Sequence, residues 1–290
     1  MRSPPDERSP DDRPAFGIVN LDKPPGPSAH QVTGWVRDLV GVDRAAHAGT
    51  LDPKVTGCLP ILLGDATRLA QVFLEGAKEY VAVLELHGPA PDDLDAVLAA
   101  FEGAIHQKPP KKSAVTRRLR VRTIHALDVL GVKERRVLCR IRCESGTYVR
   151  KLCHDLGLAL GTGAHMGDLR RVGTEPFDDT DLVSLHDLTD ALAFAEDGDT
   201  APLADAVQPA ERALVHLPRV TIAPTAAREV AEGAPVYAPG VLSIEGASAA
   251  NDEPLVACYT PDGAAVCLGR LVGEVDAERG TVVDLERVLI

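Results

Sequence analysis

The stretch His47–Gly57, which reads HAGTLDPKVTG, constrains the fold of this chain more than any other feature. Pro53 biases the preceding residue, Asp52, toward an extended or turn backbone, and the two glycines of the stretch allow tight local geometry. The apolar run Cys58–Leu63 follows at once and predicts a buried strand that anchors the loop. An Asp-Pro turn alone would explain this pattern, but a carboxylate on a stiff loop beside a buried strand also suits a reactive group.

The length and composition predict one large domain or two in a cytoplasmic protein. None of the apolar stretches in the 290 residues approaches the roughly 18 residues that span a bilayer, and the N-terminus lacks the apolar segment of a secretory signal. The six cysteines include no C-x-x-C pair. We therefore expect buried free thiols, no metal site and no membrane association.

Basic residues are concentrated in one part of an acidic chain. The formal net charge is −12, yet residues 108–151 contain 14 Lys and Arg against three acidic residues. A run at residues 106–122 has seven basic residues and no acid, which a solvated surface explains less well than a phosphate-binding flap. The basic residues predicted to contact RNA are Lys108, Lys111, Lys112, Arg117, Arg118 and Arg120.

The acidic, lysine-poor and aromatic-poor remainder predicts adaptation to high intracellular salt, where self-repulsion is screened. Only eight of the 31 basic residues are lysine, and aromatic residues make up 3% of the chain. We expect the thermal unfolding midpoint to fall as KCl is lowered from about 1 M, because the acidic surface then repels itself. Circular dichroism melts across a KCl series measure this, and a midpoint that is flat across the series would contradict the prediction.

Periodicity predicts an α+β chain with a disordered tail at residues 1–14, a catalytic domain at 15–214 and a small β domain at 215–290. Ser28 and Gln31 form a capping box at the start of a helix that ends at Gly41. Strands are predicted at residues 16–21, 80–86 and 136–143, and helices at 92–101 and after Gly146. In the 136–143 strand, alternation places Val137, Cys139, Ile141 and Cys143 on one face.

Several motifs resemble the pseudouridine synthases of the bacterial tRNA synthase B and eukaryotic dyskerin group. The HAGTLDPxxTG loop is the strongest, and the K-P-x-G-x-S segment at residues 23–28 resembles the first motif of the family. The block SGTYVRxLxxDLG at residues 145–157 resembles its third motif, and AHMGDLRR at 164–171 fits the archaeal dyskerin-type branch best. Residues 233–241, GAPVYAPGV, resemble the core of a PUA domain.

The resemblance implies a pseudouridine synthase fold with an antiparallel β-sheet and a C-terminal PUA-type β-barrel. It implies that Asp52 is the nucleophile, that Arg150 pairs with it, and that Tyr80 receives the uracil ring and handles the C5 proton. Arg150 near a helix N-terminus opposes the helix dipole, so a carboxylate partner would also explain its presence. The implied substrate-binding residues are His47, Tyr148, Leu169 and Lys78. The isomerisation is redox-neutral, so no cofactor is expected.

Three functions remain open at this level. The first is an RNA pseudouridine synthase, which is either guided by an H/ACA RNA or acts alone on the tRNA T-loop. The implied partners are tRNA, rRNA, an H/ACA guide RNA and small accessory proteins. The second is a non-catalytic RNA-binding scaffold, which would predict loss of Asp52, Tyr80 or Arg150. The third is a carboxylate-dependent hydrolase, for which the sequence offers no second acid beside Asp52. We expect the synthase.

Overall fold

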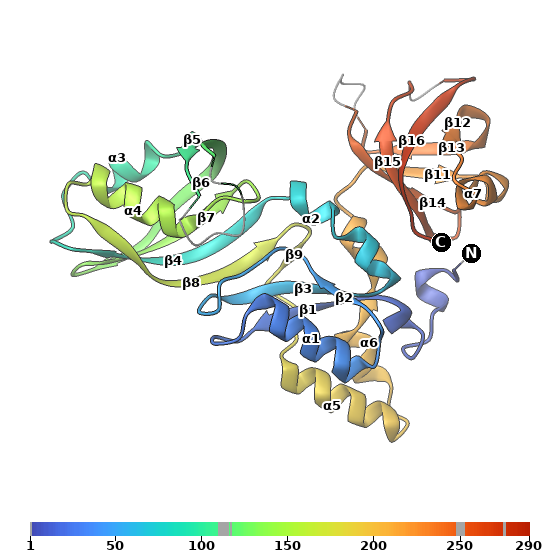
Figure 1. Cartoon of the computed structure of the whole chain (residues 1–290), viewed down its shortest axis with the longest axis horizontal. Coiled ribbons are helices and arrows are strands. Elements are labelled where there is room, and N and C mark those ends of the chain that lie inside the picture. The colour runs from blue at the N-terminus through green and yellow to red at the C-terminus, as the bar shows by residue number, and fades with distance from the viewer. Residues whose placement is uncertain (1, 110–115, 117, 248–252, 275–276) are drawn as a thin grey trace.

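The computed structural model describes residues 2–109, 116, 118–247, 253–274 and 277–290. In this part of the chain, ten strands form one long sheet in the order β10-β1-β3-β8-β4-β7-β6-β5, with β2 beside β3 and β9 beside β8 (Figure 1). The strands are β1 (Phe16–Lys23), β2 (Ala45–His47), β3 (Thr56–Gly64), β4 (Lys78–Leu86), β5 (Gly103–Gln107), β6 (Arg120–Lys133), β7 (Arg136–Cys143), β8 (Ala164–Thr174), β9 (Phe177–Asp178) and β10 (Gln208–Pro209).

The two halves of this sheet meet at a single parallel seam between β3 and β8. Thr56 pairs with Arg170 and Gly57 with Arg171, whereas the other strand pairs of this sheet are antiparallel. Gly57 has φ +96°, and a Cβ there would lie 2.2 Å from the carbonyl oxygen of Arg171. The seam therefore requires glycine at position 57. The expected antiparallel sheet is confirmed, apart from this parallel pair.

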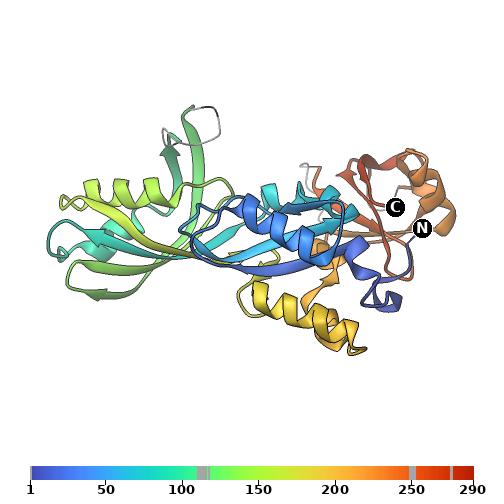
Figure 2. The ribbon, with the colours of Figure 1, turned by 60° about the horizontal axis from the view of Figure 1, so that its bottom comes forward.

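Helices pack against the sheet and complete its core. The helices of this part are α1 (Ala29–Val40), α2 (Val72–Glu75), α3 (Leu94–Ala99), α4 (Val149–Ala159), α5 (Leu185–Glu196) and α6 (Ala201–Ala206). Figure 2 shows α1 and α4 on the same side of the sheet. Apolar residues of both helices pack into one core with the inward faces of β4 and β7. The chain after β3 forms a short 3-10 turn, Asp65–Leu69, and then α2.

The local predictions for α1, β7 and the cysteines are confirmed. Ser28 and Gln31 form the predicted capping box, and Gly41 ends α1 in the left-handed conformation. The strand β7 has the predicted bounds, and its four predicted inward residues are buried. All six cysteines are free and buried. No helix of the described residues is long and apolar enough to cross a membrane.

The C-terminal part of the chain forms a second sheet around its own core. Its six described strands lie in the order β12-β16-β15-β14-β11-β13, and α7 (Pro224–Ala231) packs beside them. The strands are β11 (Arg219–Ile222), β12 (Val236–Tyr237), β13 (Val241–Glu245), β14 (Leu255–Tyr259), β15 (Ala265–Leu271) and β16 (Thr281–Val288). A separate apolar cluster joins this part to the first sheet, with Phe16 and Ile18 on one side and Tyr259 and Leu268 on the other.

Residues 1–14 are predicted from composition to be a disordered tail, yet several of them contact distant parts of the chain. The Arg8 side chain is buried and donates to both carboxylate oxygens of Glu211. Glu211 in turn accepts from the backbone N–H of Ala265 in the second sheet. Arg2 pairs with Asp65. The chain start consequently lies beside the C-terminal part in both views (Figures 1 and 2), and local composition could not reveal these distant partners.

A disordered tail would contribute nothing to the free energy of unfolding, whereas the packed N-terminal segment should contribute to it. We expect Arg8→Met to lower the free energy of unfolding by about 3–5 kcal/mol, because it leaves the Glu211 carboxylate buried without its cation. The double variant Arg8→Met with Glu211→Met should recover most of that loss, since well-packed apolar residues can replace a buried ion pair. Thermal unfolding of both variants measures the effect. A single variant that melts like the wild type would show that the pair does not hold the N-terminal segment.

Candidate functional site

The loop that carries Asp52 lies between β2 and β3 and is held from beneath by Lys23. The Lys23 ammonium is fully buried at the end of β1 and donates to the carbonyls of Pro24, Pro53 and Val55 at 2.9–3.0 Å. The backbone N–H of Val55 donates to the Asp52 carbonyl at 3.0 Å, which closes the predicted Asp-Pro turn. These bonds fix the direction in which the Asp52 side chain leaves the loop.

Arg150 forms an ion pair with Asp52, although 98 positions separate the two residues. Arg150 is the second residue of α4, and its Nη2 donates to Oδ2 of the carboxylate. The carboxylate offsets the unfavourable position of a cation near a helix N-terminus. The side chains are 51% and 50% exposed, so the carboxylate stays open to a substrate while the guanidinium orients it.

Tyr80 lies on β4 in register with Arg171 of β8 and is 9% exposed. Burial raises the pKa of the phenol, while the positive charge of Arg171 acts in the opposite direction. The hydroxyl is therefore protonated at neutral pH. A buried ring with a polar tip can present an apolar surface to a base and donate a hydrogen bond at its edge.

Arg171 is a residue of the site that sequence reasoning missed. Its side chain is 1% exposed, and its Nε donates to the carbonyl of Cys58 at 2.6 Å. Its Nη2 approaches the carbonyl of Ala48 at 3.5 Å, at the start of the Asp52 loop. Two consecutive arginines in a sequence are typical of a solvated surface. The neighbouring Arg170 matches that expectation, because its side chain is 38% exposed and makes a bidentate ion pair with Asp22.

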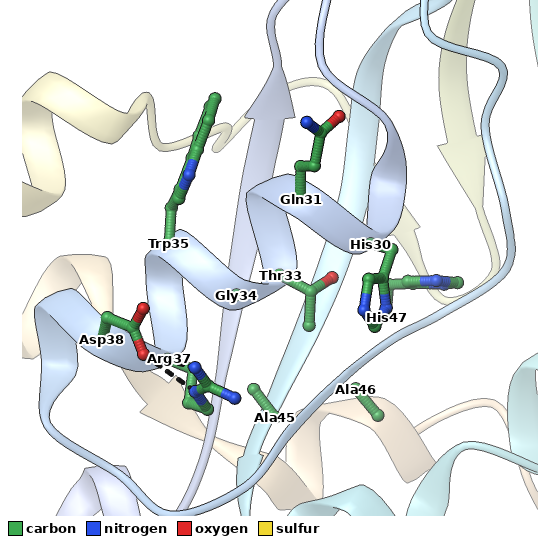
Figure 3. A pocket seen from close by; sticks show the side chains of 10 residues that line it. All are labelled: His30, Gln31, Thr33, Gly34, Trp35, Arg37, Asp38, Ala45, Ala46 and His47. Carbon is green, nitrogen blue, oxygen red and sulfur yellow. Dashed lines mark hydrogen bonds and ion pairs between the residues drawn. The ribbon is translucent and has the colours of Figure 1, made fainter.

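His47 ends β2 and faces a hollow between that strand and α1. Figure 3 shows the imidazole of His47 beside that of His30, with Ala45 and Ala46 along one wall and α1 along the other. The hollow has a volume of ≈ 490 Å³. Burial lowers the pKa of His47, and the charges of Arg171 and His30 lower it further. The imidazole is therefore neutral at neutral pH, and its Nδ1 is buried without a partner among the described atoms.

Tyr148 and Leu169 lie on elements that border the same loop. Tyr148 precedes α4 as its N-cap residue, and its backbone exchanges two hydrogen bonds with the side-chain amide of Gln107, at 2.9 and 3.3 Å. Leu169 lies on β8 opposite Ala82 and is partly buried against the core of the first sheet. The structure thus joins Asp52 directly to Arg150, and Arg171 connects the loop to the strand position opposite Tyr80. His47, Tyr148 and Leu169 lie on elements next to the loop, whereas Lys78 does not.

Lys78 lies apart from the group. Its ammonium is buried and donates to the carbonyls of Phe73 and Gly76, at 2.9 and 2.8 Å. Burial is the main cause that lowers the pKa of Lys78 to about 8, and the charge of Arg171 adds to it. The amine therefore ties the chain before β4 to the strand instead of pointing to the loop.

The basic flap is described only in part. Lys108 and Arg118 are exposed, and Arg120 begins β6 opposite Gln107 of β5. The other predicted RNA contacts, Lys111, Lys112 and Arg117, lie outside the described residues. Among residues that the structure does describe, no group of three or more His, Cys, Asp or Glu side chains could hold a metal ion.

Three family profiles together match nearly the whole chain after residue 36. The profile for the TruB family pseudouridylate synthase (N terminal domain) matches residues 37–149. That for the tRNA pseudouridylate synthase B C-terminal domain matches residues 150–215, and the PUA domain profile matches residues 218–289.

Curated relatives align with the chain from end to end. It is 67% identical over 299 residues to a probable tRNA pseudouridine synthase B of Halobacterium salinarum, covering 100% of this chain and 99% of that protein. It is 65% identical over 294 residues to the protein of the same name in Haloarcula marismortui, covering 100% and 94%.

Solved structures with similar sequences share the same architecture. A Cbf5-Nop10-Gar1 complex contains a chain with a TM-score of 0.94 and 42% identity, covering 100% of this chain and 89% of that one. An H/ACA RNP bound to a substrate RNA containing 2′-deoxyuridine contains one with a TM-score of 0.91 and 41% identity, covering 99% and 89%.

Proposed function

The chain belongs to the TruB family of pseudouridine synthases, which are RNA isomerases, and from this premise we propose that Asp52 is the nucleophile of its reaction. The ion pair between Asp52 and Arg150 is the observation that carries the proposal. The guanidinium favours the ionised carboxylate and holds its oxygens in place, while half of each side chain remains open to a substrate. A nucleophile needs both conditions.

The reaction exchanges one bond of the nucleoside for another. Asp52 adds to C1′ of the ribose or to C6 of the uracil, the N1–C1′ bond breaks, and the base turns. C5 then bonds to C1′, and the bond to Asp52 breaks and returns the free carboxylate. C5 loses its proton to solvent and N1 gains one, so the sum of atoms and electrons is unchanged. A redox-neutral isomerisation of this kind needs residues that bind the nucleoside, orient it and transfer a proton.

We assign the remaining residues by their position around Asp52. A uridine that leaves its stack loses a few kcal/mol of stacking and pairing, which an aromatic face can offset. Tyr80 supplies that face, with its hydroxyl placed for the C5 proton, and Leu169 lies beside it on β8. His47 helps to displace the target from the helix, and Tyr148 borders the bound nucleotide. The partner of Lys78 is the protein backbone, so we give it a supporting role behind β4.

We propose that the enzyme works as the catalytic subunit of an H/ACA guide particle on rRNA, with weaker unguided action on uridine-55 of the tRNA T-loop. Similar chains are found in solved complexes named for Nop10, Gar1 and an H/ACA RNP, whereas the curated relatives are named as tRNA enzymes. The basic residues of the flap bind phosphates, and phosphate contacts carry no sequence information. A guide RNA would supply the missing specificity. The six free cysteines agree with a reducing cytoplasm.

The test presents the purified chain with both substrates, with and without a guide RNA and the accessory proteins. We expect rRNA modification only in the assembled particle, and slow modification of the T-loop by the chain alone, because that loop has a defined shape. Tritium release from C5-labelled uridine measures both. Efficient rRNA modification by the chain alone would refute guide dependence, and fast, exclusive tRNA modification would favour the stand-alone synthase. The non-catalytic scaffold predicts no release with either substrate.

A further inference from the structure

The charge of Arg171 is buried beneath the site, and the described residues provide no compensating anion. No carboxylate among the described residues pairs with it, and its hydrogen bonds go to the carbonyls of Cys58 and Ala48. Buried charges in proteins are usually paired, since removing a cation from water is costly. Backbone carbonyls compensate only part of that cost. The position of Arg171 therefore calls for an explanation beyond stability.

The guanidinium of Arg171 touches three elements that carry the proposed chemistry. Its bond to Cys58 holds β3 just after the Asp52 loop, and its approach to Ala48 holds the start of that loop. A Cβ on Gly49 would lie 3.5 Å from its Nη1, so the loop backbone rests directly on the guanidinium. On the other side, Arg171 is the cross-strand neighbour of Tyr80.

Arg171 is also the charged group that faces the Tyr80 phenol. The other titratable neighbours of the phenol, from β7 and β3, are the thiols of Cys143 and Cys58. Burial raises the pKa of these thiols to about 11 and about 12, so both are neutral at neutral pH. The positive charge of Arg171 therefore acts on Tyr80 without a nearby thiolate to offset it.

We propose that Arg171 is a positioning residue that joins the backbone at Ala48–Gly49 to the Tyr80 hydroxyl, and so sets the spacing between nucleophile and phenol. Arg150 holds the Asp52 carboxylate from the solvent side, and Arg171 holds its loop from beneath. This inference rests on the proposed roles of Asp52 and Tyr80. A displacement of about 1 Å between reacting groups can cost about a hundredfold in rate.

The experiment compares Arg171→Lys and Arg171→Ala in the assembled particle by tritium release from C5-labelled uridine RNA. We expect kcat to fall by about a hundredfold in each, with KM changed by less than about threefold, because RNA binding does not involve this buried group. Added ethylguanidinium should restore part of the kcat of Arg171→Ala by filling the vacated space. Arg171→Lys retains the charge but lacks the guanidinium, so its kcat tests the positioning role even if the alanine variant does not fold.

Arg8→Ala is the matched control, because Arg8 is also a buried arginine but lies at the N-terminal segment. It should lose stability, keep its kcat below its melting temperature, and show no response to ethylguanidinium. The positioning role would be overturned if folded Arg171 variants had the same kcat as Arg8→Ala. It would also be overturned if the Arg171 substitutions changed only KM. A wild type without turnover, or an active Asp52→Asn, would instead refute the proposed function itself.

Discussion

Replacing Asp52 with asparagine is expected to abolish pseudouridine formation while leaving RNA binding nearly intact. The amide has the shape of the carboxylate but lacks its charge and nucleophilicity, and loss of a nucleophile lowers kcat by about 10⁴–10⁶-fold. Lys23 and the turn at Val55 hold the loop through backbone carbonyls, so the substitution leaves the loop geometry in place. Tritium release and a binding titration with the same RNA separate the two effects.

The control for this variant is Asp95→Asn on α3, which removes an equal charge from an exposed position outside the site. It should have wild-type turnover and binding. If Asp52→Asn retained turnover within about tenfold of the wild type, Asp52 would not be the nucleophile. If it lost binding in parallel with turnover, its main role would be to hold RNA.

Replacing Arg150 with alanine is expected to lower kcat by several orders of magnitude with little change in stability. The ion pair with Asp52 is half-exposed, and pairs of that kind contribute about 0–1 kcal/mol to folding. The loss of activity comes from a carboxylate that is no longer oriented toward the substrate. Steady-state kinetics and thermal melts of the same preparation measure both quantities.

Arg150→Lys tests whether geometry or charge matters, because lysine keeps the charge but lacks the planar fork of donors. We expect it to recover only a small part of the lost kcat. Full activity in Arg150→Lys would argue against an oriented pair and in favour of a simple electrostatic effect. Arg228→Ala, at an exposed position on α7, controls for the loss of one cation and should behave as the wild type.

The features that the sequence predicted well depend on neighbours within a few positions. Alternation along β7 identifies its buried face, and the capping box from Ser28 to Gln31 starts α1 where expected. The Asp52 loop is similarly local, since Pro53 and the flanking glycines shape its backbone directly. The family resemblance extended this local information to Arg150 and Tyr80, which periodicity alone would have left as a surface cation and a core ring.

The lysine and arginine side chains show where such reasoning fails. Lys23, Lys78, Arg8 and Arg171 are all buried, although basic residues are usually exposed. Lys23, Arg8 and Arg171 are buried because carbonyls or a carboxylate from another part of the chain receive hydrogen bonds from them. Lys78 instead donates to nearby carbonyls of the turn before β4. Nothing within a few positions of Arg8 distinguishes it from the charged residues around it, so residues 1–14 were expected to be disordered.

The sequence by itself determined the turn that carries Asp52, the helices and strands with a clear period, and the two-part organisation of the chain. Only the tertiary structure decided the parallel seam between β3 and β8, the docking of Arg8 on Glu211, and the burial of Arg171 under the loop. The physical reason is sequence separation. Propensity and periodicity act over a few residues, whereas these contacts join groups 113 and 203 positions apart, and they form only because the whole core brings them together.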